Sequence, residues 1–207
     1  MIAIVDYGVG NLFSLKSSLA AIGAGAVVTG DADVLHAADR IILPGVGAFG
    51  DAADKLAATG MRDAVLREAR SGKPLLGICL GMQLLFETGL EYGEHAGLGL
   101  IPGTVVDLKP VLPAGLKVPH IGWNALQLRQ PEHPLLKYTL AGDCVYFVHS
   151  FHAVDCAEWT LATAEYGVPV AAAVARGNVM GCQFHPEKSG TAGLNILRAF
   201  CKMERPR

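Results

Sequence analysis

The stretch of sequence that decides the fold is Pro74-Leu75-Leu76-Gly77-Ile78-Cys79-Leu80-Gly81, an apolar run that ends at a cysteine. The run Pro74–Ile78 predicts a buried strand, and Gly81–Phe86 predicts the beginning of a helix. A nucleophile on such a tight strand-to-helix turn has a strained backbone, and small residues two positions before and after it relieve the crowding. The turn also aims the sulfur at a helix N-terminus, which favours a reactive thiolate. A buried structural cysteine would explain the same letters, so this stretch alone leaves both interpretations open.

The sequence before this stretch alternates predicted strands with predicted helices. Strand-like runs occupy Ile2–Asp6, Ala26–Thr29 and Arg40–Leu43, and helical periods occupy Asn11–Ile22 and Asp51–Arg70, the latter with a possible break at Gly60. Such alternation implies right-handed crossovers and a parallel sheet. Because the strands are almost continuously apolar, we expect helices to cover both faces of that sheet.

The sequence after it is dominated by predicted strands. These are Thr104–Leu108, Ala125–Arg129, Cys144–His149, Thr160–Glu165, Val170–Ala175 and Val179–Phe184, followed by a closing helix at Ala192–Lys202. Arg176-Gly177-Asn178 predicts a hairpin turn between the last two strands. We therefore expect one α/β domain over residues 1–207, with a mixed, mainly parallel open sheet and antiparallel additions in the C-terminal half.

Composition excludes several classes of protein. About half of the 207 residues are apolar and 17% are charged, which suffices for a large core and is too apolar for a disordered chain. The net charge of −2, without a lysine or arginine run, gives no sign of a nucleic-acid partner. No apolar run approaches the ~18 residues of a membrane span, and Asp6 interrupts the first one, against a signal peptide. Five cysteines without a C-x-x-C pair indicate a reducing cytoplasm rather than a disulfide framework.

A second chemical signal is Gln183-Phe184-His185-Pro186-Glu187, at the end of a predicted strand. Side chains two positions apart on a strand point to the same side, so His185 and Glu187 can act together. His185 would be the base and Glu187 would orient it, which with Cys79 gives a Cys-His-acid triad. The tripeptide alone could be a surface turn, but each of the two motifs explains the chemistry of the other.

A third signal is the glycine-rich segment Pro44-Gly45-Val46-Gly47-Ala48-Phe49-Gly50 after Arg40–Leu43. It satisfies the G-x-G-x-x-G pattern of dinucleotide-binding proteins. The next strand, however, leads to Cys79 and not to the acidic residue that such a site needs, and the first strand of the chain leads to a different turn. We interpret the segment as a flexible backbone whose N–H groups stabilise an oxyanion, with the N–H of Leu80 as the other donor.

A metal site is the remaining possibility for polar residues of this chain. His149 and His152 have a spacing that metal ligands can use, but no carboxylate or cysteine is suitably spaced to complete the set. We expect neither a metal nor a cofactor.

The motifs PGVGAFG, GICLGMQ and FHPEKS, in this order, resemble those of the class I (triad) glutamine amidotransferase family over essentially the whole chain. The resemblance implies a glutaminase that releases glutamate and ammonia through a glutamyl thioester on Cys79, with His185 and Glu187 completing the triad. It implies an oxyanion hole formed by Val46, Gly47 and Leu80. It also implies that glutamine is bound by Gly45, Gln83, Glu91, Ser150 and Phe151. Glu91 would bind the α-amino group of glutamine, and the backbone of His149-Ser150-Phe151 its α-carboxylate.

Two further stretches resemble the glutaminase subunits of imidazole glycerol phosphate synthase. They are Asp6-Tyr7-Gly8-Val9-Gly10-Asn11-Leu12 and Pro119-His120-Ile121-Gly122-Trp123-Asn124. That resemblance implies a heterodimer with a (β/α)₈-barrel cyclase, which uses the ammonia to make imidazole glycerol phosphate and aminoimidazole carboxamide ribonucleotide in histidine biosynthesis. It places the interface at Asn11, His120, Gly122, Trp123, Asn124, Tyr146 and Lys188.

Other interpretations remain. The chain could serve another pathway, such as anthranilate, aminodeoxychorismate or pyridoxal phosphate synthesis, which the Pro119–Asn124 stretch argues against. It could be a non-catalytic docking subunit, which an intact triad disfavours. A cysteine peptidase or related hydrolase on the same turn would lack the glutamine contacts of Gln83 and Glu91.

Overall fold

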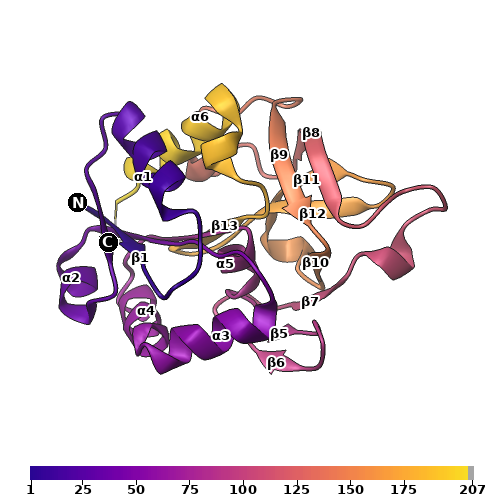
Figure 1. Ribbon diagram of the computed structural model, residues 1–207. Helices are drawn as coiled ribbons and strands as arrows, with labels where there is room; N and C mark the ends of the chain where they lie inside the picture. The colour runs from indigo at the N-terminus through magenta and orange to yellow at the C-terminus, as the bar shows by residue number, and fades with distance from the viewer. Residues whose placement is uncertain (205–207) are drawn as a thin grey trace.

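The computed structural model describes residues 1–204, which form a large sheet with helices on both of its faces (Figure 1). The sheet has nine strands in the order β2-β1-β3-β4-β13-β12-β11-β8-β9. In this order their bounds are Ala26–Thr29, Ile2–Val5, Arg40–Leu43, Leu75–Ile78, Val179–Cys182, Pro169–Arg176, Thr160–Glu165, His120–Leu128 and Cys144–His149. The expected mixed α/β architecture is confirmed.

Strand β13 is the place where the two halves of this sheet meet. It runs parallel to β4, as do the strands beyond it on that side, and antiparallel to β12, which begins the antiparallel half. In register, Cys182 of β13 lies opposite Ile78 of β4. The residues that follow these two strands, beginning with Cys79 and Gln183, therefore emerge side by side at the carboxyl edge of the sheet.

The helices divide between the two faces of the sheet. α1 (Leu12–Ala21) and α6 (Gly190–Cys201) cover one face, whereas α2 (Ala32–Ala37), α3 (Phe49–Ala58) and α4 (Met61–Arg70) cover the other (Figure 1). Alternation along β3 explains the division, because successive side chains of a strand enter opposite cores. The buried clusters follow it: Ile42 packs in the core of α1 and α6, and its neighbour Ile41 in the core of the other three helices.

The expected long helix of Asp51–Arg70 is divided at Gly60, as its sequence allowed. Gly60 has φ 74°, a left-handed conformation that glycine adopts without steric cost, and it separates α3 from α4. The helix after Cys79, α5, is a single turn from Leu80 to Gln83. Single 3₁₀ turns occupy Lys109–Val111, Pro134–Leu136, Ala157–Trp159 and Pro186–Lys188.

A second sheet was not expected. It consists of β10 (Phe151–Val154), β7 (Thr104–Asp107), β5 (Thr88–Gly89) and β6 (His95–Ala96), in this order. The predicted strand Thr104–Leu108 lies in this second sheet as β7, where it pairs with β10 and β5. Over residues 1–204, no helix is both long enough and apolar enough to cross a membrane.

Candidate active site

Cys79 occupies the turn between β4 and α5 in a conformation that side chains rarely adopt, with φ 54° and ψ −112°. A Cβ atom at Gly77 would lie 2.6 Å from the carbonyl oxygen of Gly81, and one at Gly81 would overlap the carbonyl group of Leu43. Both glycines are therefore needed for the turn after β4 to pack closely on itself and against the end of β3. The strained turn and the two tight glycines have the geometry that the sequence predicted for a nucleophile.

His185 reaches the cysteine from the neighbouring strand end. The backbone N–H of Cys79 donates to the Cys182 carbonyl at 2.8 Å, which ties the two strand ends together. Nδ1 of the His185 ring lies 2.8 Å from Oε1 of Glu187, and His185 and Cys79 line the same pocket. Sulfur, imidazole and carboxylate are thus brought to one place, although the first is more than a hundred positions away from the others in the chain.

The surroundings of His185 favour its protonated form. Burial lowers the pKa of the ring, but hydrogen bonds with Cys79 and Glu187 outweigh that effect and raise the pKa to about 9. The side chains of His185 and Glu187 are each only 4% exposed, so water does not screen their interaction. A protonated imidazole beside a nucleophile can supply the proton that a leaving amine requires.

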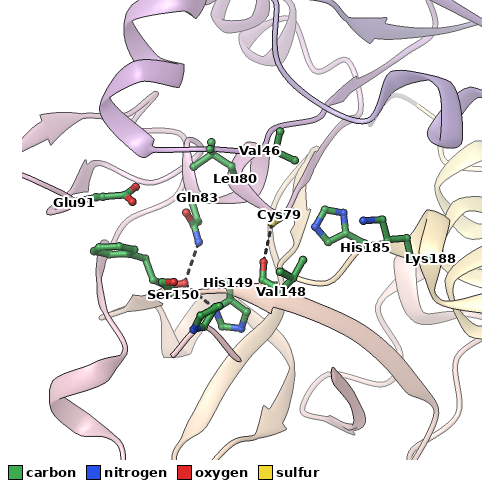
Figure 2. Close-up of a pocket in the computed structure, with 13 residues that line it drawn as sticks. Val46, Cys79, Leu80, Gln83, Glu91, Val148, His149, Ser150, His185 and Lys188 are labelled. Carbon is green, nitrogen blue, oxygen red and sulfur yellow. Dashed lines mark hydrogen bonds between the residues drawn. The ribbon is translucent and has the colours of Figure 1, made fainter. Parts of the chain in front are cut away.

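A pocket of about 350 Å³ opens beside Cys79 (Figure 2). The residues that line it are Val46, Gly47, Cys79, Leu80, Gln83, Glu91, Pro119, Val148, His149, Ser150, Phe151, His185 and Lys188. In Figure 2, Glu91 lies on the opposite side of Gln83 from Cys79 and His185. The pocket therefore offers a carboxylate at one end and the nucleophile at the other, an arrangement suited to a small molecule with an ammonium group and a distant reactive carbon.

The glycine-rich segment forms one wall of the pocket. Val46 and Gly47 line it, and Gly47 has φ 100°. Gly45 is buried outside the lining, where a Cβ atom would lie 2.8 Å from the backbone nitrogen of Gly81 and 2.9 Å from Oη of Tyr7. The structure thus gives Gly45 a packing role between two turns, and it does not bring this residue to the glutamine-binding position that the resemblance implied.

Two side chains predicted to contact glutamine, those of Gln83 and Glu91, are held in place by hydrogen bonds within the protein. The Nε2 atom of Gln83 donates to the Phe151 carbonyl at 3.0 Å and to Oε1 of Gln183 at 2.9 Å. Oε2 of Glu91 accepts from the backbone N–H of Phe49 at 2.7 Å, at the first residue of α3. These contacts fix an amide and a carboxylate in the pocket wall before any ligand binds.

Part of the predicted interface forms one surface beside the pocket. Trp123 is 56% exposed, and its ring meets that of Tyr146 edge to face at 5.9 Å across the β8–β9 pair. The ammonium group of Lys188, a pocket residue, lies 5.7 Å from the centre of the Tyr146 ring. Ile121 is 57% exposed and was missed by the sequence analysis. Asn11 is half-buried and caps α1 by accepting from the N–H of Ser14.

The expected surface role of His120 needs correction, because its side chain is fully buried. Strand β8 begins at His120 and not at Ala125, so alternation sends Trp123 outward and His120, Gly122 and Asn124 to the opposite face. The half-buried Asn124 bonds to His120 and to the Glu165 carbonyl within this chain.

His149 was considered both as a metal ligand and as part of the segment that holds the α-carboxylate, and it lines the pocket with Val148 and Pro119. Among the described residues, no three His, Cys, Asp or Glu side chains are grouped as they are around a metal. Cys182 is fully buried, and burial raises the pKa of its thiol well above the usual range, which agrees with a structural cysteine.

Comparison with known proteins gives a consistent result. Residues 3–203 match the family described as "Glutamine amidotransferase class-I". The chain is 50% identical to "Imidazole glycerol phosphate synthase subunit HisH" of Wolinella succinogenes, covering 98% of this chain and 100% of that one. It is 51% identical to the subunit of the same name from Bacillus licheniformis, covering 97% and 95%. Among solved structures, "Structure of PurLQS from Thermotoga maritima" has a TM-score of 0.72 at 21% identity and 96% coverage of both chains, a likeness of fold.

Proposed function

The chain belongs to the class I glutamine amidotransferase family, and from that premise we propose that it hydrolyses glutamine with Cys79, His185 and Glu187 and passes the ammonia to a cyclase subunit. The observation that carries the proposal is the position of His185, which is 2.8 Å from Glu187 through Nδ1 and lines, together with Cys79, a pocket large enough for an amino acid.

Glutamine would bind along the pocket. Its ammonium group pairs with the Glu91 carboxylate, which the N–H of Phe49 already holds in place. The backbone of Ser150 and Phe151, which lines the same cavity, receives the α-carboxylate. The side-chain amide then points toward Cys79, which lies on the opposite side of Gln83 from Glu91 (Figure 2).

The first half of the reaction forms a thioester. The Cys79 sulfur attacks the amide carbon, and the carbonyl oxygen becomes an oxyanion that the N–H groups of Leu80 and of the Val46–Gly47 segment stabilise. His185, protonated as its raised pKa favours, gives its proton to the amide nitrogen. The carbon–nitrogen bond breaks, ammonia leaves, and the glutamyl group stays on the sulfur.

The second half consumes water. Neutral His185 takes a proton from a water molecule, which attacks the thioester carbon. The carbon–sulfur bond breaks, glutamate leaves, and the proton returns the Cys79–His185 pair to its starting state. Glu187 holds the ring through Nδ1 in both halves, so that Nε2 faces the reacting atoms.

The acceptor of the ammonia is the finer part of the proposal. The relatives at about 50% identity carry the name of an imidazole glycerol phosphate synthase subunit, which supports a place in histidine biosynthesis. We assign the partner surface to Trp123, Tyr146 and Lys188, because exposed aromatic rings beside a pocket mouth are typical anchors of an interface. The partner would be a (β/α)₈-barrel cyclase that receives ammonia and is the other half of a heterodimer.

Two expectations stay predictions. The match over residues 3–203 supports a single domain over residues 1–207. The five cysteines are all free, and this supports a reducing compartment such as the cytoplasm.

The decisive experiment measures ammonia and glutamate release by the complex with the cyclase, using the wild type, Cys79→Ala and the exposed-cysteine control Cys144→Ser. We expect Cys79→Ala to hydrolyse no glutamine while the complex still uses added ammonia, and Cys144→Ser to behave as wild type. A glutamine-analogue electrophile should label Cys79 in the wild type. Glutamine hydrolysis that survives Cys79→Ala would refute the nucleophile.

A further inference from the structure

Two buried histidines connect the underside of β8 to the glutamine pocket through three short contacts. Nε2 of His120 lies 2.7 Å from Oδ1 of Asn124, and Nδ1 of His120 lies 2.9 Å from Nε2 of His149. Nδ1 of His149 lies 2.8 Å from the carbonyl oxygen of Phe151. The two histidines are also register partners across the β8–β9 pair. The series therefore runs from an amide oxygen, through two imidazole rings, to a backbone carbonyl in the pocket wall.

The rings are held in place and kept neutral. The ring of His120 is stacked between Tyr166, at 3.9 Å, and Phe147, at 4.9 Å, and both partner rings are inclined to it by 18°. Burial lowers the pKa of His120, and it lowers the pKa of His149 to about 3, to which the nearby His120, His152 and His185 also contribute. Each ring therefore carries one hydrogen at neutral pH.

This gives two hydrogens for three contacts. The oxygens at the two ends, Oδ1 of Asn124 and the Phe151 carbonyl, can only accept. The amide of Asn124 cannot turn over without loss, because its Nδ2 donates to the Glu165 carbonyl at 2.9 Å. One contact in the series must therefore go without a hydrogen.

Two arrangements leave only an end contact unmade. In the first, both rings carry the hydrogen on Nδ1, so that His149 donates to Phe151, His120 donates to His149, and Asn124 has no donor. In the second, both rings carry it on Nε2, so that His120 donates to Asn124, His149 donates to His120, and the Phe151 carbonyl loses its donor. A third arrangement satisfies both end oxygens but leaves two buried ring nitrogens facing each other without a donor. Each of the first two leaves only one ring nitrogen without a donor, because the Phe151 carbonyl still accepts from Gln83 and the half-buried Asn124 oxygen is open to water.

The Phe151 end lies in the binding site. The same carbonyl accepts from Nε2 of Gln83 at 3.0 Å, and Ser150, Phe151 and His149 all line the pocket. Losing the His149 donor removes one of the two side-chain hydrogen bonds to this carbonyl, which belongs to the segment assigned above to the α-carboxylate of glutamine.

We propose that His120 and His149 are positioning residues for glutamine binding, which hold the Phe151 carbonyl in place when both rings carry hydrogen on Nδ1, and that Asn124 competes for those hydrogens. The proposal rests on the proposed function for its ligand. Because Asn124 directly follows the exposed Trp123 on β8, a partner seated on Trp123 acts next to the competing end of the series.

The kinetic test uses two conservative replacements in the complex with the cyclase subunit. In His149→Asn, the amide nitrogen takes the position of Nδ1 and still donates to Phe151. In His149→Gln, the amide reaches the position of Nε2 and leaves that carbonyl without this donor. We expect the KM for glutamine to rise roughly 2- to 10-fold in His149→Gln, the effect of one lost hydrogen bond, with kcat changed less than about twofold. His149→Asn should raise the KM less than His149→Gln does, and the control His36→Gln, whose histidine side chain is 72% exposed, should stay within about twofold of wild type.

The proposal would be overturned if the KM for glutamine were not higher in His149→Gln than in His149→Asn. Equal impairment of the two variants, or no impairment in either, would both be such results. Thermal unfolding of each variant shows whether it is folded. A wild-type complex that hydrolyses no glutamine would contradict the proposed function instead.

A second readout does not depend on activity. With ¹⁵N-labelled histidine, NMR of Asn124→Leu, which removes the competing oxygen, should show hydrogen on Nδ1 of both His120 and His149 without any glutamine. Cys79→Ala saturated with glutamine should show the same. Hydrogen on Nε2 of both rings in Asn124→Leu would refute the proposed series.

Discussion

Oε1 of Glu187 lies 2.8 Å from Nδ1 of His185, and this contact leaves Nε2 of the ring for the Cys79 sulfur. The two residues are neighbours in the chain, whereas the sulfur comes from the adjacent strand end. The proposed base and its orienting carboxylate are thus one local unit, and the sheet places the proposed nucleophile against it.

Replacing the carboxylate tests that unit. Glu187→Gln keeps the size of the side chain but removes the negative charge that holds and stabilises the protonated ring. We expect kcat for glutamine hydrolysis to fall by about 10²- to 10⁴-fold with little change in KM, as for orienting acids in other triads. Ammonia-dependent activity of the complex should be unchanged. The control Glu132→Gln removes an exposed carboxylate, and an equal loss there would argue against a specific role of Glu187.

The raised pKa of His185 predicts a pH dependence. Burial lowers that pKa, but the hydrogen bonds with Cys79 and Glu187 raise it to about 9, so the ring keeps its proton at neutral pH and loses it as the pH rises through 9. The acid that protonates the leaving amide nitrogen is then lost, and kcat/KM for glutamine should fall on the alkaline side with a midpoint near 9. In Glu187→Gln the midpoint should move to lower pH. A profile that is flat up to pH 10, or unmoved in the variant, would contradict this assignment.

The glycines around Cys79 predict a large effect on stability. A Cβ atom at position 81 meets the backbone of Leu43, which cannot move without shifting β3. We expect Gly81→Ala to lower the free energy of unfolding by more than about 2 kcal/mol in equilibrium urea denaturation. Gly25→Ala is the matched control, since a Cβ atom there meets nothing within 4 Å, and its change should stay within about 0.5 kcal/mol. Equal stability of the two variants would show that the turn is not tight.

The surface at Trp123 predicts partner-dependent activity. Because ammonia released into water is lost to the partner, we expect slow glutamine turnover by this chain alone and faster turnover with the cyclase present. The peptides between Gly45 and Gly47 are the natural switch, since Gly47 already has φ 100° and glycine backbones rotate at low cost. Trp123→Ala should weaken the complex by roughly 2 kcal/mol or more, measured by calorimetric titration.

The control for this prediction is the second tryptophan of the chain, Trp159, which stacks on Arg176 away from the pocket lining. Trp159→Ala, if folded by circular dichroism, should bind the cyclase as wild type does. High turnover without a partner, or equal weakening by both variants, would count against the interface.

Much of the fold could be predicted because its signals are local. The apolar runs of β1 to β4 and β13 are continuous, and the turn at Cys79 is indicated by glycines two positions before and two positions after it. The residues proposed as triad follow from the same logic, since each motif lies at a strand end. Strands β5 and β6 have two residues each, too few for any periodicity, and they were missed for that reason.

The error at β8 has a different cause. His120 and Gly122 interrupt the expected alternation of apolar and polar residues, so the strand seemed to begin only at Ala125. A fully buried histidine is possible because His149 and Asn124 contact its two ring nitrogens. One of these partners is close in the chain and the other is distant, and sequence spacing predicts neither contact. Sequence pattern could place Trp123 on a surface, but it could not separate that face of the strand from the one beneath it.

The meeting of two half-sheets at β13 also governs when the protein can become reactive. Gln183 and Cys79 touch although they are 104 positions apart, so ribosomal synthesis delivers the sulfur long before its imidazole. A chain that ends before β13 holds the Cys79 thiol without its imidazole. The β13–β4 pairing joins Cys182 to Ile78, a non-local contact of the kind that forms slowly in folding, so the two side chains meet only after both half-sheets have joined.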